Sequence, residues 1–204
     1  MKPSPRTAWI LFGLAAVTAG AMAGAMFFSH SPTPTQAATL LQAPRPVADF
    51  QLLDPQGRRV GTESLRGQWN VVFAGFTNCA YICPTTLSLL NQVVTAMGTD
   101  QAPQVVLLSV DPERDTPQRM KTYLAQFNPH FTGLTGDAAQ LASLRSNLGL
   151  VAAKMSGPAS NTYTVDHSAA LVIINPQGEI AGYFSPPFNA SALSDDLRQL
   201  TRGS

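Results

Sequence analysis

The chain has 204 residues, enough for one ordinary domain of about 100–200 residues plus a short additional segment. Charged residues make up only 12% and hydrophobic residues 45%, which excludes a highly charged, disordered chain. The net charge of +1 shows no basic surplus of the kind that nucleic-acid binders carry, so we expect no nucleic-acid partner. Two cysteines and three histidines allow at most one metal site rich in sulfur and nitrogen.

An uncharged, mostly apolar segment occupies residues 7–28. As a helix rising about 1.5 Å per residue it would span about 33 Å, enough for a hydrocarbon core of about 30 Å. Lys2 and Arg6 precede it and no positive charge closely follows, so the positive-inside rule predicts a cytoplasmic tail at residues 1–6 and an exported remainder. We expect a single-pass anchor in a bacterial inner membrane with the C-terminal domain in the periplasm. A cleaved signal peptide is the alternative, because Ala21–Ala23 resembles a cleavage site.

Residues 29–46 contain four prolines among Ser, Thr, Gln and Ala residues. Segments of this composition are extended and carry little secondary structure, so we predict a tether between the anchor and a folded domain. The domain is predicted over residues 47–204, a length that buries one hydrophobic core.

Strands and helices alternate through the predicted domain, as the spacing of apolar residues and the turn signals indicate. In chain order the predicted elements are a hairpin over Phe50–Val60, a strand over Asn70–Phe76, a helix over Pro84–Met97, a strand over Gln104–Val110, a helix from Pro117 to about Phe127, a helix over Asp137–Leu148, strands over Ala170–Asn175 and Glu179–Phe184, and a helix over Ser194–Thr201. This order predicts an α/β domain whose central mixed sheet has helices on both faces. The final hairpin and helix resemble the end of a thioredoxin-like fold.

Both cysteines lie where the strand at 70–76 gives way to the helix at 84–97, and sites of α/β sheets gather at such carboxyl ends of strands. Amides at a helix N-terminus favour thiolates there. At helical spacing the Cβ atoms of Cys79 and Cys83 lie about 5–6 Å apart, whereas a disulfide needs about 3.8 Å. A metal ion about 2.3 Å from each sulfur spans the pair more easily, so the spacing favours a soft ion such as Cu(I) without excluding a strained, reducible disulfide.

A site with two sulfurs needs a third ligand, and an imidazole would also accommodate Cu(II). His30 lies in the predicted tether and His130 follows a helix, so we expect neither to bind metal. His167 lies just before the strand at 170–175, in the turn that faces the start of the cysteine helix in a thioredoxin-like fold. We therefore predict His167 as the third ligand.

Four segments resemble signatures of the SCO/SenC family, the copper chaperones of cytochrome c oxidase assembly. They are Thr77–Leu87, Ser109–Pro117, Leu134–Gly136 and Tyr163–Ser168, and they occur in the family's order behind the expected anchor. The resemblance covers about Phe50 to Leu200. It implies a thioredoxin-like fold and one copper ion per chain, bound by Cys79, Cys83 and His167. It also implies delivery of copper to the binuclear copper site of an oxidase subunit.

The chain departs from the family after the first cysteine, where Ala80 and Tyr81 replace the usual Pro-Asp. The carboxylate that would lie beside the metal is therefore absent. Tyr81 is either a docking residue for the partner or a ring that shields the site or packs on the helix.

Three further features each have two interpretations. Asp166 either orients the His167 ring or is a turn residue. Met155 either lends a soft thioether to the site or fills a loop or core position. The charged segment 111–115 either faces a partner or forms a salt-bridge network around Arg114 together with a helix cap.

Three functions are compatible with these residues. The first is a membrane-tethered copper chaperone without enzymatic activity, whose partners are the oxidase subunit and a copper donor or thiol reductant. The second is a thiol-disulfide oxidoreductase that reduces the cysteines of the oxidase copper site, with Cys79 and Cys83 as the redox pair, because copper loading in an oxidising compartment needs reduced thiols. The spacing of three residues and the absence of a proline at 165–167 favour the chaperone. The third is a thiol peroxidase, which needs an activating arginine, and none lies near the cysteine motif in sequence.

Overall fold

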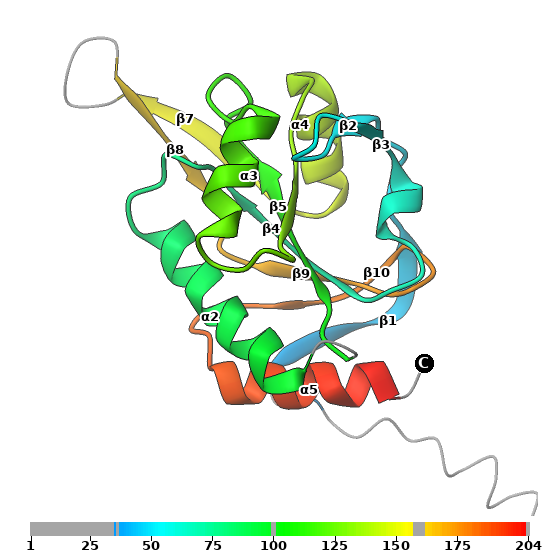
Figure 1. Cartoon of the computed structure of the whole chain (residues 1–204). Helices are drawn as coiled ribbons and strands as arrows, with labels where there is room; N and C mark the ends of the chain where they lie inside the picture. The colour runs from blue at the N-terminus through cyan, green and yellow to red at the C-terminus, as the bar shows by residue number, and fades with distance from the viewer. Residues whose placement is uncertain (1–34, 36, 99–100, 157–161, 203–204) are drawn as a thin grey trace, which may run out of the picture. The chain divides into compact units, whose positions relative to one another are not determined.

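The computed structural model describes residues 35, 37–98, 101–156 and 162–202 (Figure 1). The predicted tail and anchor, residues 1–28, lie outside the described residues, as does His30. Within the described part of the chain, no helix is both long enough and apolar enough to cross a membrane.

The described elements follow one another as strands, short 3-10 turns and helices. In chain order they are β1 (Ala38–Pro46), β2 (Leu52–Leu53), β3 (Arg59–Val60), η1 (Thr62–Leu65), β4 (Asn70–Gly75), α2 (Ile82–Met97), β5 (Gln104–Ser109), α3 (Pro117–Ala125), β6 (Thr132–Leu134), α4 (Ala138–Asn147), β7 (Ala152–Ser156), β8 (Tyr163–His167), β9 (Leu171–Ile174), β10 (Glu179–Phe184) and α5 (Ala190–Arg202).

A six-stranded mixed sheet in the order β1-β10-β9-β4-β5-β6 forms the centre of the domain, as predicted. β4, β5 and β6 pair in parallel, whereas β4 pairs antiparallel with β9, β9 with β10 and β10 with β1. Two small hairpins, β2-β3 and β7-β8, stand apart from this sheet. The second of them carries His167 at its end.

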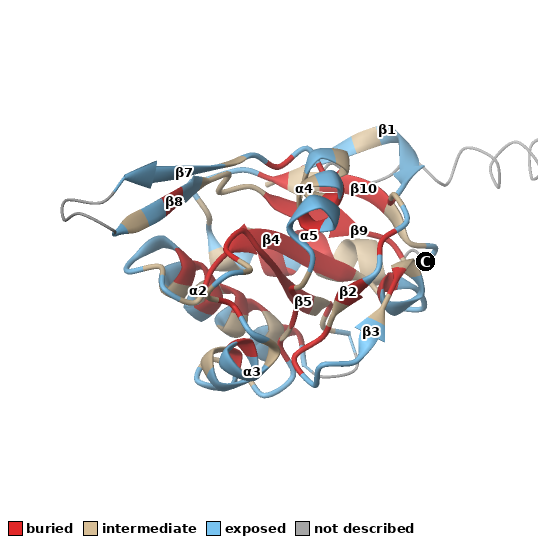
Figure 2. Ribbon diagram, turned by 90° about the horizontal axis from the view of Figure 1, so that it is seen from above, coloured by how far each residue is buried: buried red, intermediate tan, exposed pale blue. Residues whose placement is uncertain are grey.

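The central strands are buried on both faces, which is why their sequences are nearly continuous apolar runs. All six residues of β4 are buried (Figure 2). Alternate side chains of the strand enter different cores. Val71 and Phe73 pack with α2, α3 and α5 in one core. Val72 and Ala74 pack with α4 and the β2-β3 hairpin in the other. The helices therefore cover both faces of the sheet, as the alternation of elements predicted.

The prediction that the Pro-rich tether extends to Pro46 is wrong for residues 38–46, which form β1 at the edge of the main sheet. The prolines do not exclude strand pairing here, because an edge strand tolerates residues that lack an N–H. The start of β1 is fixed by Asp196 of α5, a buried carboxylate that accepts the N–H groups of Ala37 (2.7 Å) and Ala38 (2.8 Å). The domain thus begins before residue 47.

Most helix ends follow from local sequence. The Thr116 side chain accepts the N–H of Arg119 and Pro117 opens α3, while Asp137 caps α4 by accepting the N–H of Gln140. β6, β7 and β8 were not predicted from the sequence. These strands are short, and β7 is almost wholly exposed, so it lacks the apolar alternation that marks a strand.

We expect Asp196→Ala to destabilise the domain by about 2–3 kcal/mol, because the two amides at the start of β1 lose their acceptor. Urea unfolding of a fragment starting at residue 35 measures this loss. The control is the neighbouring Asp195→Ala, which removes an exposed ion pair with Arg198 (3.0 Å) and is expected to cost less than about 1 kcal/mol. Equal effects of the two substitutions would show that Asp196 does not anchor β1.

Candidate metal centre

The two cysteines lie at the carboxyl end of β4, in the loop that leads into α2. The helix begins at Ile82, so Cys83 lies in its first turn while Cys79 lies in the preceding loop. The expected helical spacing of the two cysteines is therefore wrong, because only Cys83 is helical. Pro84 is accommodated in the first turn, where a missing N–H costs no helical hydrogen bond.

The sulfur of Cys79 accepts a hydrogen bond from the start of α2, as a polar capping side chain normally does. The first amides of a helix have no partner within the helix, and Tyr81 at the N-cap position offers no side-chain hydrogen bond. The backbone N–H of Cys83 instead donates to Cys79 Sγ at 3.4 Å. This places the two sulfur-bearing side chains on the same side of the helix start.

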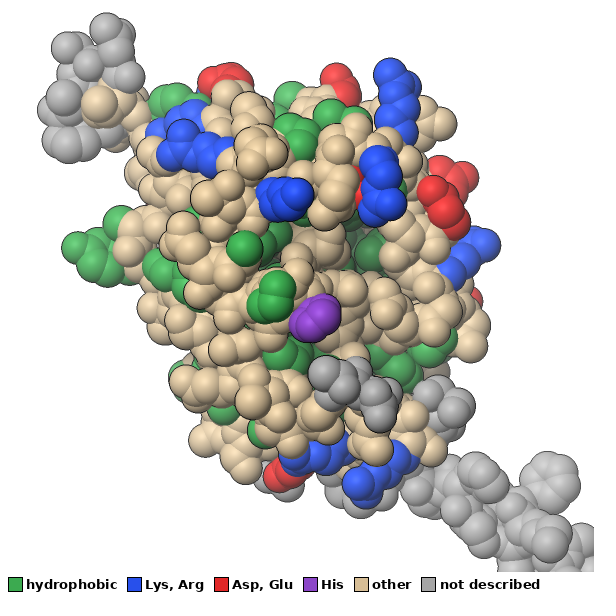
Figure 3. Space-filling view, in the orientation of Figure 1, with side chains coloured by type: hydrophobic (Ala, Val, Ile, Leu, Met, Phe, Trp, Pro, Cys, Tyr) green, Lys and Arg blue, Asp and Glu red, His purple; other side chains and the backbone are tan. Residues whose placement is uncertain are grey.

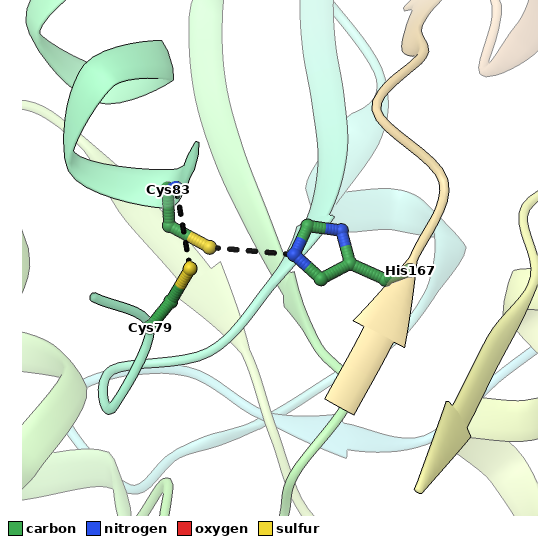
Figure 4. Close-up of side chains that lie close together, drawn as sticks. All are labelled: Cys79, Cys83 and His167. Atoms are coloured by element: carbon green, nitrogen blue, oxygen red, sulfur yellow. Dashed lines mark hydrogen bonds between the residues drawn. The ribbon is translucent and has the colours of Figure 1, made fainter. Parts of the chain in front are cut away.

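His167 reaches the cysteines from the end of β8 (Figure 4). Its Nε2 lies 3.5 Å from Cys83 Sγ, and its Nδ1 lies 3.0 Å from the Ser168 carbonyl oxygen. A carbonyl only accepts, so Nδ1 carries a proton and Nε2 is the atom that points toward the sulfurs. Phe76, buried directly after β4, packs edge-to-face against the ring with centroids 6.0 Å apart.

The structure thus brings together the three residues that the sequence predicted as ligands. Their ligand atoms all lie within 4.8 Å of one another, and no other such group of three occurs among the residues described. To bind an ion at about 2.1–2.3 Å each, the ligand atoms must lie no more than about 4.6 Å apart. Small side-chain movements are therefore enough to form the site. Cys83 is buried, Cys79 and His167 are half-buried, and both cysteines are reduced.

The two thiols differ in acidity. The pKa of Cys79 is lowered to about 4 by the hydrogen bond from Cys83, with His167 and nearby backbone amides adding to the effect against the cost of burial. The pKa of Cys83 is raised because its side chain donates to Cys79 and because it is buried. Burial lowers the pKa of His167, but hydrogen bonds to the Cys79 thiolate and the Ser168 carbonyl outweigh it, so the net shift is upward. Without metal, the site therefore holds a Cys79 thiolate beside a His167 whose pKa is raised above its ordinary value.

The loop that carries Cys79 is supported by the buried carboxylate of Asp115, which the sequence indicated only as part of a charged segment. Asp115 accepts hydrogen bonds from the Thr77 N–H (2.9 Å), the Thr77 hydroxyl (2.7 Å) and the Ser109 hydroxyl (2.6 Å). Burial raises its pKa, although these hydrogen bonds oppose the rise. The salt-bridge interpretation of the segment is confirmed for Arg114, which pairs with buried Asp111, and the helix cap is Thr116, the residue that follows the segment.

Three other residues considered as ligands or supporting groups lie away from the site. Met155 pairs with Thr164 in the β7-β8 hairpin and so projects from the face opposite to His167. Asp166 also lies on that opposite face, and the Ser168 carbonyl, not Asp166, binds the imidazole Nδ1. His130 lies in the loop before β6 and does not belong to the three-residue group. Sequence pattern gave no signal for the role of Ser168, because a backbone carbonyl is common to every residue.

The rim of the site is apolar on the side of the loop before α2. The Tyr81 side chain is 84% exposed, so it does not pack on the helix, and Ile82 beside it is 46% exposed. Hydrophobic side chains project at the edge formed by this loop (Figure 3). On the face shown there, Lys and Arg side chains are scattered among acidic and uncharged ones rather than gathered into one band.

Comparison with known proteins agrees with the motifs. The sequence pattern of the SCO1/SenC family matches residues 38–202 of this chain. A Stutzerimonas stutzeri protein that is named for copper binding is 38% identical over 166 residues, 79% of each chain. The mitochondrial SCO2 homolog of Bos taurus is 36% identical over 163 residues, which are 78% of this chain and 61% of that protein.

A solved structure confirms the expected architecture. Bradyrhizobium japonicum ScoI, determined with copper bound, matches with a TM-score of 0.69 and 35% identity, covering 76% of this chain and 99% of that one. The predicted thioredoxin-like fold is therefore confirmed for the described domain. From its matching sequence pattern and its relatives, this chain belongs to the SCO1/SenC family.

Proposed function

We propose that this protein binds one copper ion through Cys79, Cys83 and His167 and delivers it to the binuclear copper site of cytochrome c oxidase. The observation that carries the proposal is the convergence of two sulfurs and one imidazole nitrogen within 4.8 Å at the end of the sheet. Two thiolates select soft Cu(I), and the added imidazole also suits Cu(II). Two further observations support this proposal. The B. japonicum relative binds copper, and four sequence segments resemble those of oxidase copper chaperones.

Release to a partner follows from how the three ligands are held. Three protein ligands leave a coordination position open to an incoming thiolate of the recipient, which can then share the ion with the donor. Cys79 is the more exposed sulfur, and His167 belongs to a different segment from the cysteines. Loss of His167 from the ion would therefore loosen the site without disturbing the Cys79–Cys83 pair.

We expect reduced full-length protein to bind one Cu(I) per chain in an anaerobic titration against a competing chelator. Cys79→Ala and Cys83→Ala are expected to abolish tight binding, because one sulfur and one imidazole remain. His167→Ala is expected to weaken retention by roughly 10–100-fold while leaving the dithiol intact. His130→Ala, a histidine outside the cluster, is the matched control and should bind like the wild type. Wild-type retention in the His167→Ala variant would refute the ligand assignment.

A second candidate function, reduction of a disulfide in the oxidase copper site, is favoured by the unequal acidity of the cysteines. A stable Cys79 thiolate beside a protonated Cys83 thiol is the arrangement of an attacking and a resolving cysteine. Cys79 would attack one sulfur of the partner disulfide, and Cys83 would then attack Cys79 to release the partner as a dithiol. The partner disulfide is reduced by two electrons while Cys79 and Cys83 become a disulfide.

The acidity of Cys79 can be measured directly in the reduced, metal-free protein. Because its pKa is about 4, Cys79 is a thiolate throughout pH 6–8, and its alkylation by iodoacetamide should change little over this range. An ordinary thiol of pKa about 8.5 would react nearly two orders of magnitude faster at pH 8 than at pH 6. Mass spectrometry identifies the modified cysteine. A steep rise in rate over this range, or modification of Cys83 first, contradicts the assignment.

We further propose that residues 7–28 anchor the protein in a bacterial inner membrane with the domain in the periplasm. The apolar segment and the preceding Lys2 and Arg6 support this orientation. Because β1 begins at Ala38, only residues 29–37 separate anchor and sheet, which limits the domain to within about 30 Å of the membrane.

Protease added to intact spheroplasts tests this topology. The domain should be digested without lysis, and it should sediment with the membranes before digestion. Recovery of the domain as a freely soluble periplasmic fragment would instead indicate a cleaved signal peptide.

A further inference from the structure

The three proposed ligands come from two separate parts of the chain, so their relative position must be set by contacts between those parts. Cys79 and Cys83 lie between β4 and α2, whereas His167 ends β8. The β7-β8 hairpin is not part of the six-stranded sheet, and it projects from the domain in both ribbon views (Figures 1 and 2). A two-stranded hairpin alone is only marginally stable in water, so other contacts must hold it.

One loop, residues 110–116 between β5 and α3, contacts both parts. On the cysteine side, the Asp115 carboxylate accepts hydrogen bonds from the backbone N–H and the hydroxyl of Thr77. On the histidine side, Asp111 accepts a hydrogen bond of 2.7 Å from the Tyr163 hydroxyl at the start of β8. The loop therefore links the segment that carries Cys79 to the strand that carries His167.

The contact with β8 is built around the Tyr163 ring. Arg114 pairs with Asp111, donates to the Tyr163 carbonyl at 3.3 Å and places its guanidinium carbon 3.9 Å from the ring centroid. Lys154 of β7 lies 4.4 Å from the same centroid and pairs with Glu113 at 2.8 Å. The Asp111 carboxylate is fully buried and receives both Arg114 and Tyr163, so it favours one arrangement of the hairpin over others.

The other end of β8 is held independently. The Ser168 N–H donates to the Val151 carbonyl at 2.9 Å, and the Val151 N–H donates to the Ser168 hydroxyl at 2.8 Å. These bonds tie β8 to the strand it already pairs with, not to the rest of the domain. The buried Val165 side chain and the contact of Phe76 with the His167 ring also hold β8. Among the described contacts, the hydrogen bonds that join β8 to the 110–116 loop are made at Tyr163.

We propose that Tyr163, held by Asp111 and Arg114, is a positioning residue that sets the place of His167 relative to Cys79 and Cys83. This inference rests on the proposed copper binding through His167. Tyr163 and His167 are the two ends of one five-residue strand, so a tilt allowed at Tyr163 displaces the imidazole from the sulfurs. Tyr163 itself is not a ligand.

Tyr163→Phe in the full-length protein is the first test, because it removes the hydroxyl and keeps the ring beneath Arg114. We expect Cu(I) affinity, measured by chelator competition, to fall on the order of tenfold. Tyr183→Phe is the matched control, since that hydroxyl also bonds an arginine, Arg45 at 3.0 Å, but lies on β10. It should leave Cu(I) affinity unchanged.

A double-mutant cycle separates positioning from a general loss of stability. If Tyr163 acts through His167, then Tyr163→Phe should lower affinity in the wild type and have no further effect in the His167→Ala background. Equal losses in both backgrounds, or wild-type affinity of Tyr163→Phe, would overturn the proposal. If wild type and His167→Ala bind equally, the ligand assignment fails instead, and the two failures are thereby distinguished.

Two readouts add evidence beyond affinity. In metal-free protein, the amides of residues 163–167 should exchange with solvent faster in Tyr163→Phe than in Tyr183→Phe. In the Cu(II)-loaded protein, the imidazole nitrogen coupling in the electron paramagnetic resonance spectrum should weaken in Tyr163→Phe alone. If Tyr163→Phe does not fold, Arg114→Lys serves in its place, because it keeps the charge but loses the planar stacking on Tyr163. Unchanged exchange and an unchanged spectrum would contradict the proposal.

Discussion

The parallel pairing of β4 with β5 is the constraint on which the site depends. Because parallel strands end at the same edge of a sheet, the loop after β4 and the loop after β5 must lie side by side. The first loop carries Cys79 and the second carries Asp111 and Asp115. The buried Asp115 carboxylate joins the two loops through Thr77, and Asp111 extends the contact to the hairpin that bears His167. The metal centre is thus assembled at one sheet edge from segments distant in sequence.

The chemistry of the site follows from the start of α2. An unpaired amide of its first turn donates to Cys79, while the Cys83 side chain is buried and donates to the same sulfur. One sulfur is therefore anionic and half-exposed, and the other is protonated and enclosed. Metal binding must displace the proton of the Cys83 thiol, so metal affinity is coupled to pH. This difference in acidity and exposure between the two cysteines suits both ligand exchange and thiol exchange. It explains why one cysteine pair supports both proposed functions.

The sheet and its helices could largely be predicted from sequence because their signals are local. β4, β5, β9 and β10 are buried on both faces and stand out as apolar runs, and α3 and α4 begin at the capping residues Thr116 and Asp137. β1 could not be predicted, because its pairing with β10 and its anchor on Asp196 involve residues more than 130 positions away. Its prolines indicated a tether when the segment was considered alone.

For the site, the available donor residues could be read directly from the amino-acid sequence. Two cysteines and one well-placed histidine left a single donor set, and the order of the motifs indicated the family. Three features became visible only in the folded chain: Cys79 precedes the helix, Ser168 rather than Asp166 orients the imidazole, and Met155 points away from the site. The physical reason is that donor chemistry belongs to individual side chains, whereas orientation and acidity arise from burial and from hydrogen bonds between segments that only folding brings together.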